Sequence, residues 1–216
     1  MKYSSVIFDW DGTLGMTLHL WIEGYTSELK KLGFTFSNEV IVEDFFYEHD
    51  KSAVKYPDID FEYLVQQARK YVFDHVSSLE TYPDAFSVLE KLQNNNIALT
   101  LVSSSTRKLL KKGLEEVGLN KFFSVMVSAD DIMRFKPDPE AFNQVIEIAK
   151  LNPKNTIILG DSHNDIIAAK AAGIDSCLFL PEENKIFYNF DKLKKTNPIY
   201  CVKSLNDFVE IILDTE

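Results

Sequence analysis

Cysteine is scarce in this sequence, which contains only Cys177 and Cys201 among its 216 residues. Two cysteines cannot build a framework of several disulfides, and the lack of a CxxC pair or a Cys/His cluster argues against a zinc site. Long apolar runs are also missing, whereas a membrane helix needs about 20 apolar residues. The first segment, MKYSSVIFDWDG, reaches charged residues after a very short apolar run. We therefore expect a cytoplasmic protein with neither a signal peptide nor a membrane helix.

Basic residues are outnumbered, because 23 Lys and Arg stand against 33 Asp and Glu and give a formal net charge of −10. Binding to a nucleic-acid backbone depends mainly on basic side chains that displace counterions, so nucleic acid is not an expected partner. A small phosphorylated metabolite is compatible with this charge. Apolar residues make up 45% and charged residues 26% of the chain, which is typical of a folded globular protein with one or two domains.

Short apolar runs rich in Val, Ile and Leu recur along the chain and predict strands. They are Ser5 to Phe8, Ile97 to Val102, Phe123 to Val127, Thr156 to Leu159, Ser176 to Leu180 and Ile199 to Val202. Several are apolar at every position, as strands covered on both faces are, which indicates a parallel sheet. From about residue 84 these runs alternate with segments of helical spacing. The pattern predicts an α/β fold with a doubly wound parallel sheet.

Residues 16–82 interrupt this alternation with an all-helical pattern. Apolar side chains recur there in steps of three and four, first at Leu18, Ile22, Tyr25, Leu29 and Leu32, and then at Phe61, Leu64, Ala68, Val72 and Val76. An insertion of this length directly after the first strand is too long for a simple crossover. We therefore predict a helical cap domain of residues 16–82 and a core domain of residues 1–15 and 83–216. The acidic run from Glu43 to Asp50 is interpreted as a solvated helix face.

Two acids follow the first predicted strand in the sequence Asp9-Trp10-Asp11-Gly12-Thr13. Ligands of open α/β sheets bind beyond the carboxyl ends of the strands, so reactive groups are expected at this position. Because side chains alternate along an extended chain, Asp9 and Asp11 should point the same way, and Gly12 permits a turn. An ordinary Asp-Gly turn is the alternative, so the other strand ends have to decide between the two.

A serine cluster, Ser103-Ser104-Ser105, follows the second predicted strand. Hydroxyls and unpaired backbone N–H groups at the start of a helix form an anion cradle that suits a phosphate. Ser104 or Ser105 could instead cap the next helix, and the two roles are compatible. Lys136 lies in a loop stiffened by two prolines and could supply positive charge. The alternative is an ordinary surface lysine before a helix.

A further acidic cluster, from Asp161 to Asp165, follows the predicted strand Thr156 to Leu159. Together with Asp9 and Asp11, the residues Asp161 and Asp165 would crowd four acids at one edge of the sheet. These acids would repel one another in a low local dielectric and therefore need a cation. Ligands that are all oxygen indicate a hard ion. Mg²⁺ is favoured over zinc or calcium because it usually keeps some of its water ligands and also binds a substrate oxygen.

In order and spacing, the segments FDWDGTL, LVSSST, KPDP and GDSHNDI resemble the four motifs of the haloacid dehalogenase-like hydrolase superfamily, and the insertion resembles its class I cap. The resemblance covers nearly the whole chain and implies a Mg²⁺-dependent phosphatase with a Rossmann-like core. It implies that Asp9 is the nucleophile and a metal ligand. Asp11 would be the general acid and base, and a metal ligand through its backbone carbonyl. Asp161 would be the remaining protein ligand of the metal.

The resemblance also implies how the substrate is held. Ser103, helped by Ser104, would hold the transferring phosphoryl group, and Lys136 would bridge it to the nucleophile. Asp165 would organise the surroundings of the metal ion without touching it. The implied reaction forms an aspartyl phosphate and then hydrolyses it, with a small organic phosphate of the phosphoglycolate type as the favoured substrate.

Several alternatives stay open. Sugar phosphomutases of the superfamily share all four motifs, although Met16 stands where many members with this cap have an aspartate. Dehalogenases lack an acid at the position of Asp11. Phosphonatases use a cap lysine, but the lysines of the insertion are interpreted as surface residues: Lys30, Lys31, Lys51 and Lys55. A phosphoacceptor signalling domain or a binding protein without activity would belong to another class of function.

The cap is expected to close over the site, select the substrate and exclude water. Which of its side chains reach the substrate does not follow from the sequence pattern. The candidates are His19, Trp21, Tyr25, His49 and Arg69, and a core or surface role is the simpler interpretation of each. The expected oligomeric state is a monomer or a weak homodimer.

Overall fold

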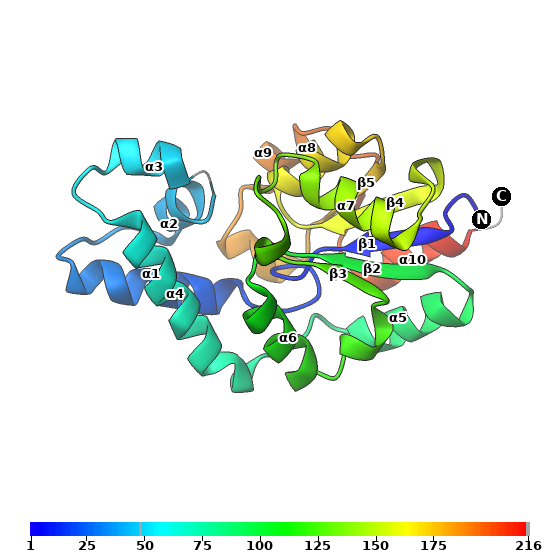
Figure 1. Cartoon of the computed structure of the whole chain (residues 1–216), viewed down its shortest axis with the longest axis horizontal. Helices are drawn as coiled ribbons and strands as arrows, with labels where there is room; N and C mark the ends of the chain where they lie inside the picture. Colours follow the sequence, from blue (N-terminus) through cyan, green and yellow to red (C-terminus); the bar gives the residue numbers. More distant parts are fainter. Residues whose placement is uncertain (48, 215–216) are drawn as a thin grey trace.

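The computed structural model describes residues 1–47 and 49–214, with only the backbone described at residues 49 and 50. Six parallel strands form one sheet in the order β3-β2-β1-β4-β5-β6 (Figure 1). The strands are β1 (Ser5–Phe8), β2 (Ala98–Val102), β3 (Val125–Val127), β4 (Thr156–Gly160), β5 (Asp175–Phe179) and β6 (Tyr200–Val202). This is a doubly wound order that reverses direction between β1 and β4. The predicted α/β fold is confirmed, with small shifts at the strand ends.

Helices cover both faces of the sheet, and the side chains of the inner strand β1 alternate between two apolar clusters, one on each face. Val6 and Phe8 pack with α5 (Ala85–Asn94), α6 (Arg107–Glu116) and α10 (Leu205–Leu213). Ile7 points to the other face and packs with α7 (Glu140–Ala149) and α8 (His163–Ala172). The short helix α9 (Phe190–Lys194) lies between β5 and β6 in the chain. Each large apolar side chain buried in this way contributes about 1.5–3 kcal/mol to folding.

The insertion between β1 and β2 is helical. It contains α1 (Leu18–Lys31), α2 (Asn38–Phe45), α3 (His49–Lys55) and α4 (Phe61–His75), which lie together beside one end of the sheet (Figure 1). Helices α1 and α4 cross closely, because a Cβ atom at Gly24 would lie 3.2 Å from the backbone of Ala68. Gly15 and Thr81 pair in an isolated antiparallel bridge. The two connections between the insertion and the sheet therefore lie side by side.

Apolar side chains also join the insertion to the sheet. Leu18 and Tyr25 of α1 belong to one buried cluster with Ile166 of α8 and with Leu178 and Leu180 at the end of β5. This packing places α1 beyond the carboxyl ends of the strands, which is the ligand-binding edge of such a sheet. Within the described residues, no helix combines the length and the apolar character needed to cross a membrane.

Candidate active site

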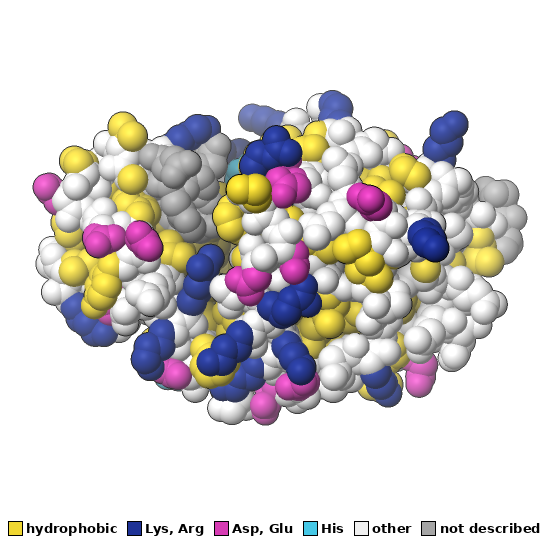
Figure 2. All heavy atoms as spheres, in the orientation of Figure 1, with side chains coloured by type: hydrophobic (Ala, Val, Ile, Leu, Met, Phe, Trp, Pro, Cys, Tyr) yellow, Lys and Arg dark blue, Asp and Glu magenta, His cyan; other side chains and the backbone are white. Residues whose placement is uncertain are grey.

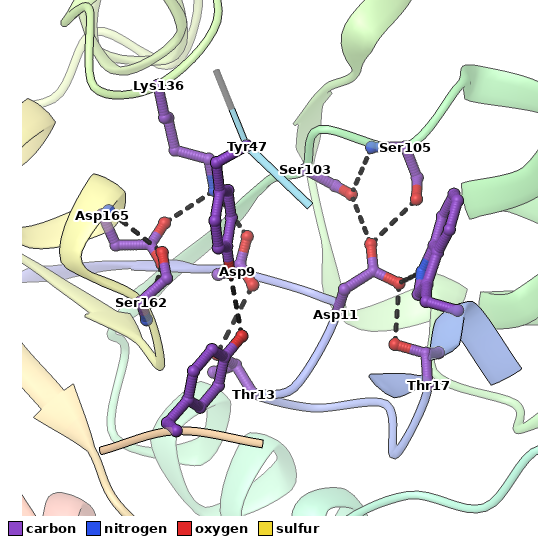
Figure 3. Close-up of polar contacts among 12 residues, drawn as sticks. Asp9, Asp11, Thr13, Thr17, Tyr47, Ser103, Ser105, Lys136, Ser162 and Asp165 are labelled. Atoms are coloured by element: carbon purple, nitrogen blue, oxygen red, sulfur yellow. Dashed lines mark hydrogen bonds and ion pairs between the residues drawn. The ribbon is translucent and has the colours of Figure 1, made fainter. Parts of the chain in front are cut away.

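A cavity of about 100 Å³ lies between the carboxyl edge of the sheet and the insertion. The core contributes its polar lining from the ends of three strands and one loop: Asp9, Asp11, Ser104, Ser105, Lys136, Asp161, Ser162, Asn164 and Asp165. The insertion contributes a mainly aromatic and apolar wall: Leu18, Trp21, Tyr25, Phe46, Tyr47, Val65 and Arg69. Parts of the chain that are far apart in sequence thus meet around one small space (Figure 3).

Lys136 joins two of the acids. Its Nζ atom lies 2.6 Å from Asp9 Oδ1 and 2.6 Å from Asp165 Oδ1, and its side chain is only 6% exposed. Burial acts to lower the pKa of Lys136, but the charges of Asp165 and Asp9 and the hydrogen bonds to them raise it overall. The ammonium group therefore stays protonated. Lys136 is not the surface lysine of the alternative interpretation.

Asp9 lies directly after β1 and is buried. Burial raises the pKa of its carboxyl group from 3.8 to about 8; the charge of Lys136 opposes this rise, and the nearby Asp165 and Asp11 add to it. The Thr13 hydroxyl lies 3.5 Å from Asp9 Oδ2. Because Asp9 is costly to ionise in these surroundings, additional positive charge is needed to hold it as a carboxylate near neutral pH.

Asp161 provides the clearest indication of a cation site. Its Oδ2 atom is buried and has no hydrogen-bond partner within the described residues. One carboxylate oxygen each from Asp9, Asp161 and Asp165 lie within 4.8 Å of one another. Burial and then the charges of Asp9 and Asp165 raise the pKa of Asp161. A cluster of oxygen ligands with an unpartnered buried oxygen fits a hard divalent cation such as Mg²⁺.

Gly12 makes room for this cluster. Its φ of 80° lies in the left-handed region, and a Cβ atom at this position would collide with the carboxylate of Asp161. A residue with a side chain would therefore strain the backbone and displace Asp161. The Asp-Gly turn is thus present, but it serves to bring the β1 loop against the acid that follows β4.

Asp11 accepts hydrogen bonds at both carboxylate oxygens (Figure 3). Oδ1 accepts from Thr17 Oγ1 at 2.7 Å and from Trp21 Nε1 at 2.8 Å. Oδ2 accepts from Ser105 Oγ at 2.8 Å and from Ser103 Oγ at 3.3 Å. The insertion therefore holds one oxygen of Asp11 and the β2 loop holds the other. Asp9 and Asp11 line the same cavity, as expected, but have different polar partners.

The three serines after β2 have different surroundings: Ser103 is buried, whereas Ser104 and Ser105 line the cavity. Ser103 is buried, and its hydroxyl contacts Asp11 and accepts a hydrogen bond from the Ser105 backbone N–H at 3.0 Å. Ser104 is exposed at its surface yet lines the cavity together with Ser105. Neither Ser104 nor Ser105 caps α6, because the N-cap residue is Thr106 and its side chain makes no capping hydrogen bond. The pattern did not single out Ser105 as a partner of Asp11.

Asp165 is buried and lies beside Asp9 and Asp161, as the crowding of acids at this edge predicts. Its Oδ2 accepts from Ser162 Oγ at 2.6 Å in a capping box at the start of α8, while its Oδ1 faces Lys136. The Ser162-x-x-Asp165 pattern is a signal for that capping box. The contact with Lys136 has no such local signal, since the two residues come from separate segments.

Three of the five cap candidates line the cavity: Trp21, Tyr25 and Arg69. His19 is exposed and is not part of the lining, and the side chain of His49 lies outside the described residues. The lysines interpreted as surface residues are exposed: Lys30, Lys31, Lys51 and Lys55. Each candidate lies on a helix, and helical spacing alone does not show which face meets the core.

Phe46 and Tyr47 were missed because they lie within the acidic run interpreted as a solvated helix face. Helix α2 ends at Phe45, and the chain then turns these two aromatic side chains into the cavity wall. The Tyr47 and Tyr188 hydroxyls lie 2.8 Å apart and share a hydrogen bond between the insertion and the core (Figure 3). Asp50, at the end of the run, has no described side chain.

This chain is similar to known proteins in both sequence and fold. A family model described as haloacid dehalogenase-like hydrolase matches residues 6–179. A pyrophosphatase PpaX from Oceanobacillus iheyensis is 28% identical over all of this chain and 99% of its own length. A predicted phosphoglycolate phosphatase from Haemophilus somnus superposes with a TM-score of 0.80 at 23% identity, covering 98% of both chains. A hydrolase from Pseudomonas syringae has a TM-score of 0.84 at 19% identity, covering 97% of both chains.

Proposed function

We propose that this chain, which belongs to the haloacid dehalogenase-like hydrolase family, is a Mg²⁺-dependent phosphatase in which Asp9 attacks phosphorus and is transiently phosphorylated. One observation carries the proposal. Asp9 and Asp165 share the buried ammonium of Lys136, directly beside the unpartnered oxygen of Asp161. Attraction of this kind lets a carboxylate and a phosphoryl group approach each other despite their like charges.

In this proposal Asp9 and Asp161, with the backbone carbonyl of Asp11, hold the Mg²⁺ ion. A bound Mg²⁺ would supply positive charge that polarises the phosphoryl oxygens. Lys136 reduces the repulsion between Asp9 and the incoming phosphoryl group, and Asp165 fixes the position of the ammonium. Ser103 and Ser104, with the backbone N–H groups at the start of α6, would hold the remaining phosphoryl oxygens for in-line attack.

Asp11 is proposed to move the protons. It would donate a proton to the leaving-group oxygen as Asp9 forms the aspartyl phosphate, and then accept a proton from the water that hydrolyses this intermediate. Its four hydrogen-bond donors hold the carboxyl group at the cavity wall, beside the position where the leaving group must lie. Orientation of this kind is needed because proton transfer requires hydrogen-bond distance to the reacting oxygen.

The insertion is proposed to act as a cap domain of residues 16–82 over a core of residues 1–15 and 83–216. Three observations support this division: the cavity has walls from both parts, the two connections pair at Gly15 and Thr81, and the Tyr47–Tyr188 hydrogen bond joins the two parts. A closed cap would keep water away from the aspartyl phosphate except for the attacking molecule. A small phosphorylated metabolite of the cytosol is the proposed partner.

Two compact substrates are favoured. Phosphoglycolate is the first, as inferred from the sequence motifs. Inorganic pyrophosphate is the second, because the relative from Oceanobacillus iheyensis named as a pyrophosphatase matches the whole chain. The cavity of about 100 Å³ is smaller than an engineered cavity of about 150 Å³ that holds benzene. This size argues against the sugar phosphate of a phosphomutase.

The test is release of inorganic phosphate from phosphoglycolate, pyrophosphate, glucose 6-phosphate and a nucleoside monophosphate, with Mg²⁺ and with a chelator. Wild type should turn over at least one compact substrate only with Mg²⁺, and Asp9→Asn should lose nearly all activity. Acid-quenched wild type should carry a phosphoryl group on the peptide that contains Asp9. Equal phosphate release by wild type and Asp9→Asn would contradict the proposal.

A further inference from the structure

Arg69 is the second cation in the cavity lining, and its situation differs from that of Lys136. The Lys136 ammonium already donates to two carboxylates. Arg69 is half-buried in α4 and pairs with no acid whose side chain the structure describes, that is, among residues 1–47 and 51–214. A guanidinium presents several donors in a planar fork that matches a carboxylate or a phosphate. The cavity lining therefore includes an anion-binding group that no described acidic side chain occupies.

The close crossing of α1 and α4 fixes where this guanidinium lies. Gly24 lies close to Ala68, since a Cβ atom at Gly24 would be 3.2 Å from the Ala68 backbone. The residues that follow each of these, Tyr25 and Arg69, both line the cavity. Burial raises the pKa of the Tyr25 hydroxyl and the charge of Arg69 opposes the rise, which agrees with their proximity. Both side chains line the cavity, on the insertion side, facing the acids of the core.

The surroundings of Arg69 strengthen its attraction for an anion. The same cavity is also lined by Leu18, Trp21 and Val65, and apolar walls lower the local dielectric and so strengthen charge–charge attraction. The phosphoryl-binding groups all come from the core, whereas Arg69 comes from the insertion. A substrate whose phosphorus faces Asp9 therefore directs its leaving group towards Arg69.

We propose that Arg69 binds an anionic group on the leaving-group side of the substrate and thereby sets its specificity. The inference rests on the proposed phosphatase function and narrows it. The substrate class is a compact phosphate compound whose leaving group carries its own oxyanion, either a carboxylate, as in phosphoglycolate, or a second phosphate, as in pyrophosphate. The small cavity restricts this leaving group to a few heavy atoms.

The experiment compares matched substrates on wild type and Arg69→Gln. Phosphoglycolate and 2-hydroxyethyl phosphate have leaving groups of nearly equal size, but only the first carries a carboxylate. Arg69→Gln should lower kcat/KM for phosphoglycolate and for pyrophosphate roughly 10- to 100-fold, mainly through KM, the size expected for a hydrogen bond to a charged group. For 2-hydroxyethyl phosphate, kcat/KM of Arg69→Gln should stay within about twofold of the wild-type value. The larger of the two losses identifies the carboxylate or the second phosphate as the natural anion.

Two controls separate this inference from the proposed function. Lys70→Gln removes the adjacent exposed cation, which pairs with Asp74. This variant should leave kcat/KM unchanged for both phosphoglycolate and 2-hydroxyethyl phosphate. Binding of phosphoglycolate and pyrophosphate is measured by calorimetry on Asp9→Asn, with and without Arg69→Gln, so that no turnover is required. The role of Arg69 is overturned if Arg69→Gln lowers kcat/KM equally for charged and neutral leaving groups. It is also overturned if Arg69→Gln changes neither kcat/KM nor the binding affinity. Retained activity in Asp9→Asn alone overturns the mechanism and leaves the binding comparison to decide on Arg69.

Discussion

Trp21 Nε1 donates a hydrogen bond of 2.8 Å to Asp11 Oδ1, and so a helix of the insertion directly holds a carboxylate of the β1 loop. Thr17, at the start of α1, donates to the same oxygen. Any movement of α1 away from the sheet would remove both donors at once. The position of the proposed general acid and base is therefore coupled to the position of the insertion.

Trp21→Phe should lower kcat roughly tenfold while leaving the fold intact. Phenylalanine keeps an aromatic ring in the cavity wall but cannot donate to Asp11, and a hydrogen bond to a charged group contributes about 1.5–3 kcal/mol. Steady-state kinetics on the preferred substrate and a thermal unfolding curve give the measurement. Tyr25→Phe, which removes a hydroxyl from the same helix, is the control and should have a smaller effect on kcat. An unchanged kcat in Trp21→Phe would show that Thr17 alone positions Asp11.

Lys136→Met should reduce the free energy of unfolding by roughly 3 kcal/mol, because removing one partner of a buried ion pair leaves the other charges uncompensated. Urea denaturation at neutral pH without Mg²⁺ measures this loss. Lys2→Met is the matched control: the Lys2–Asp175 pair is also 2.6 Å long, but the lysine is 56% exposed. Removal of this exposed pair should cost less than about 1 kcal/mol. Similar losses in the two variants would mean that burial of Lys136 does not strengthen its pairing.

Asp161→Asn should stabilise the metal-free protein and weaken its response to Mg²⁺. The substitution removes an acid from a buried group of three, and burial with the charges of Asp9 and Asp165 raises the pKa of Asp161, so its charged form is disfavoured without a cation. Thermal unfolding with a chelator should therefore give a higher midpoint for the variant. Added Mg²⁺ should raise the midpoint of wild type more than that of the variant.

Asp191→Asn, at a side chain that is 94% exposed, is the control for Asp161→Asn and should respond to Mg²⁺ as wild type does. The cation-site interpretation would be wrong if Asp161→Asn and wild type gained the same stabilisation from Mg²⁺.

Without divalent metal, the protein should lose stability as pH rises from about 4 to about 8. Burial raises the pKa of Asp9 from 3.8 to about 8, so between these values the native state keeps a proton that the unfolded state has released. The stabilising contribution of this group is full below its unfolded pKa and is lost as pH rises through its folded pKa.

Urea denaturation across this pH range should show a shallower pH dependence in Asp9→Asn than in wild type. Mg²⁺ should also flatten the wild-type dependence, since a bound cation keeps the carboxylate ionised in the native state. Identical pH dependences of wild type and Asp9→Asn would show that Asp9 titrates normally.

Much of the fold follows from patterns within single segments. The apolar runs identify the six strands because strands covered on both faces of a sheet are mostly apolar. Their parallel arrangement brings their carboxyl ends to one edge, which is why Asp9 and Asp161 could be expected to meet although more than half of the chain separates them. Gly12 and the Ser162–Asp165 capping box are also readable locally, since each reflects the conformation of its own turn.

The sequence by itself thus determined the parallel sheet, the helical insertion and the acids at the strand ends, because these depend on periodicity and on short-range backbone geometry. Only the tertiary structure decided which side chains of the insertion face the acids. Helices α1 and α4 approach closely at Gly24 and Ala68, and Arg69 of α4 lines the cavity, as does Tyr47 beyond the end of α2. Such choices depend on how separate helices pack, and that packing has no signature within any one segment.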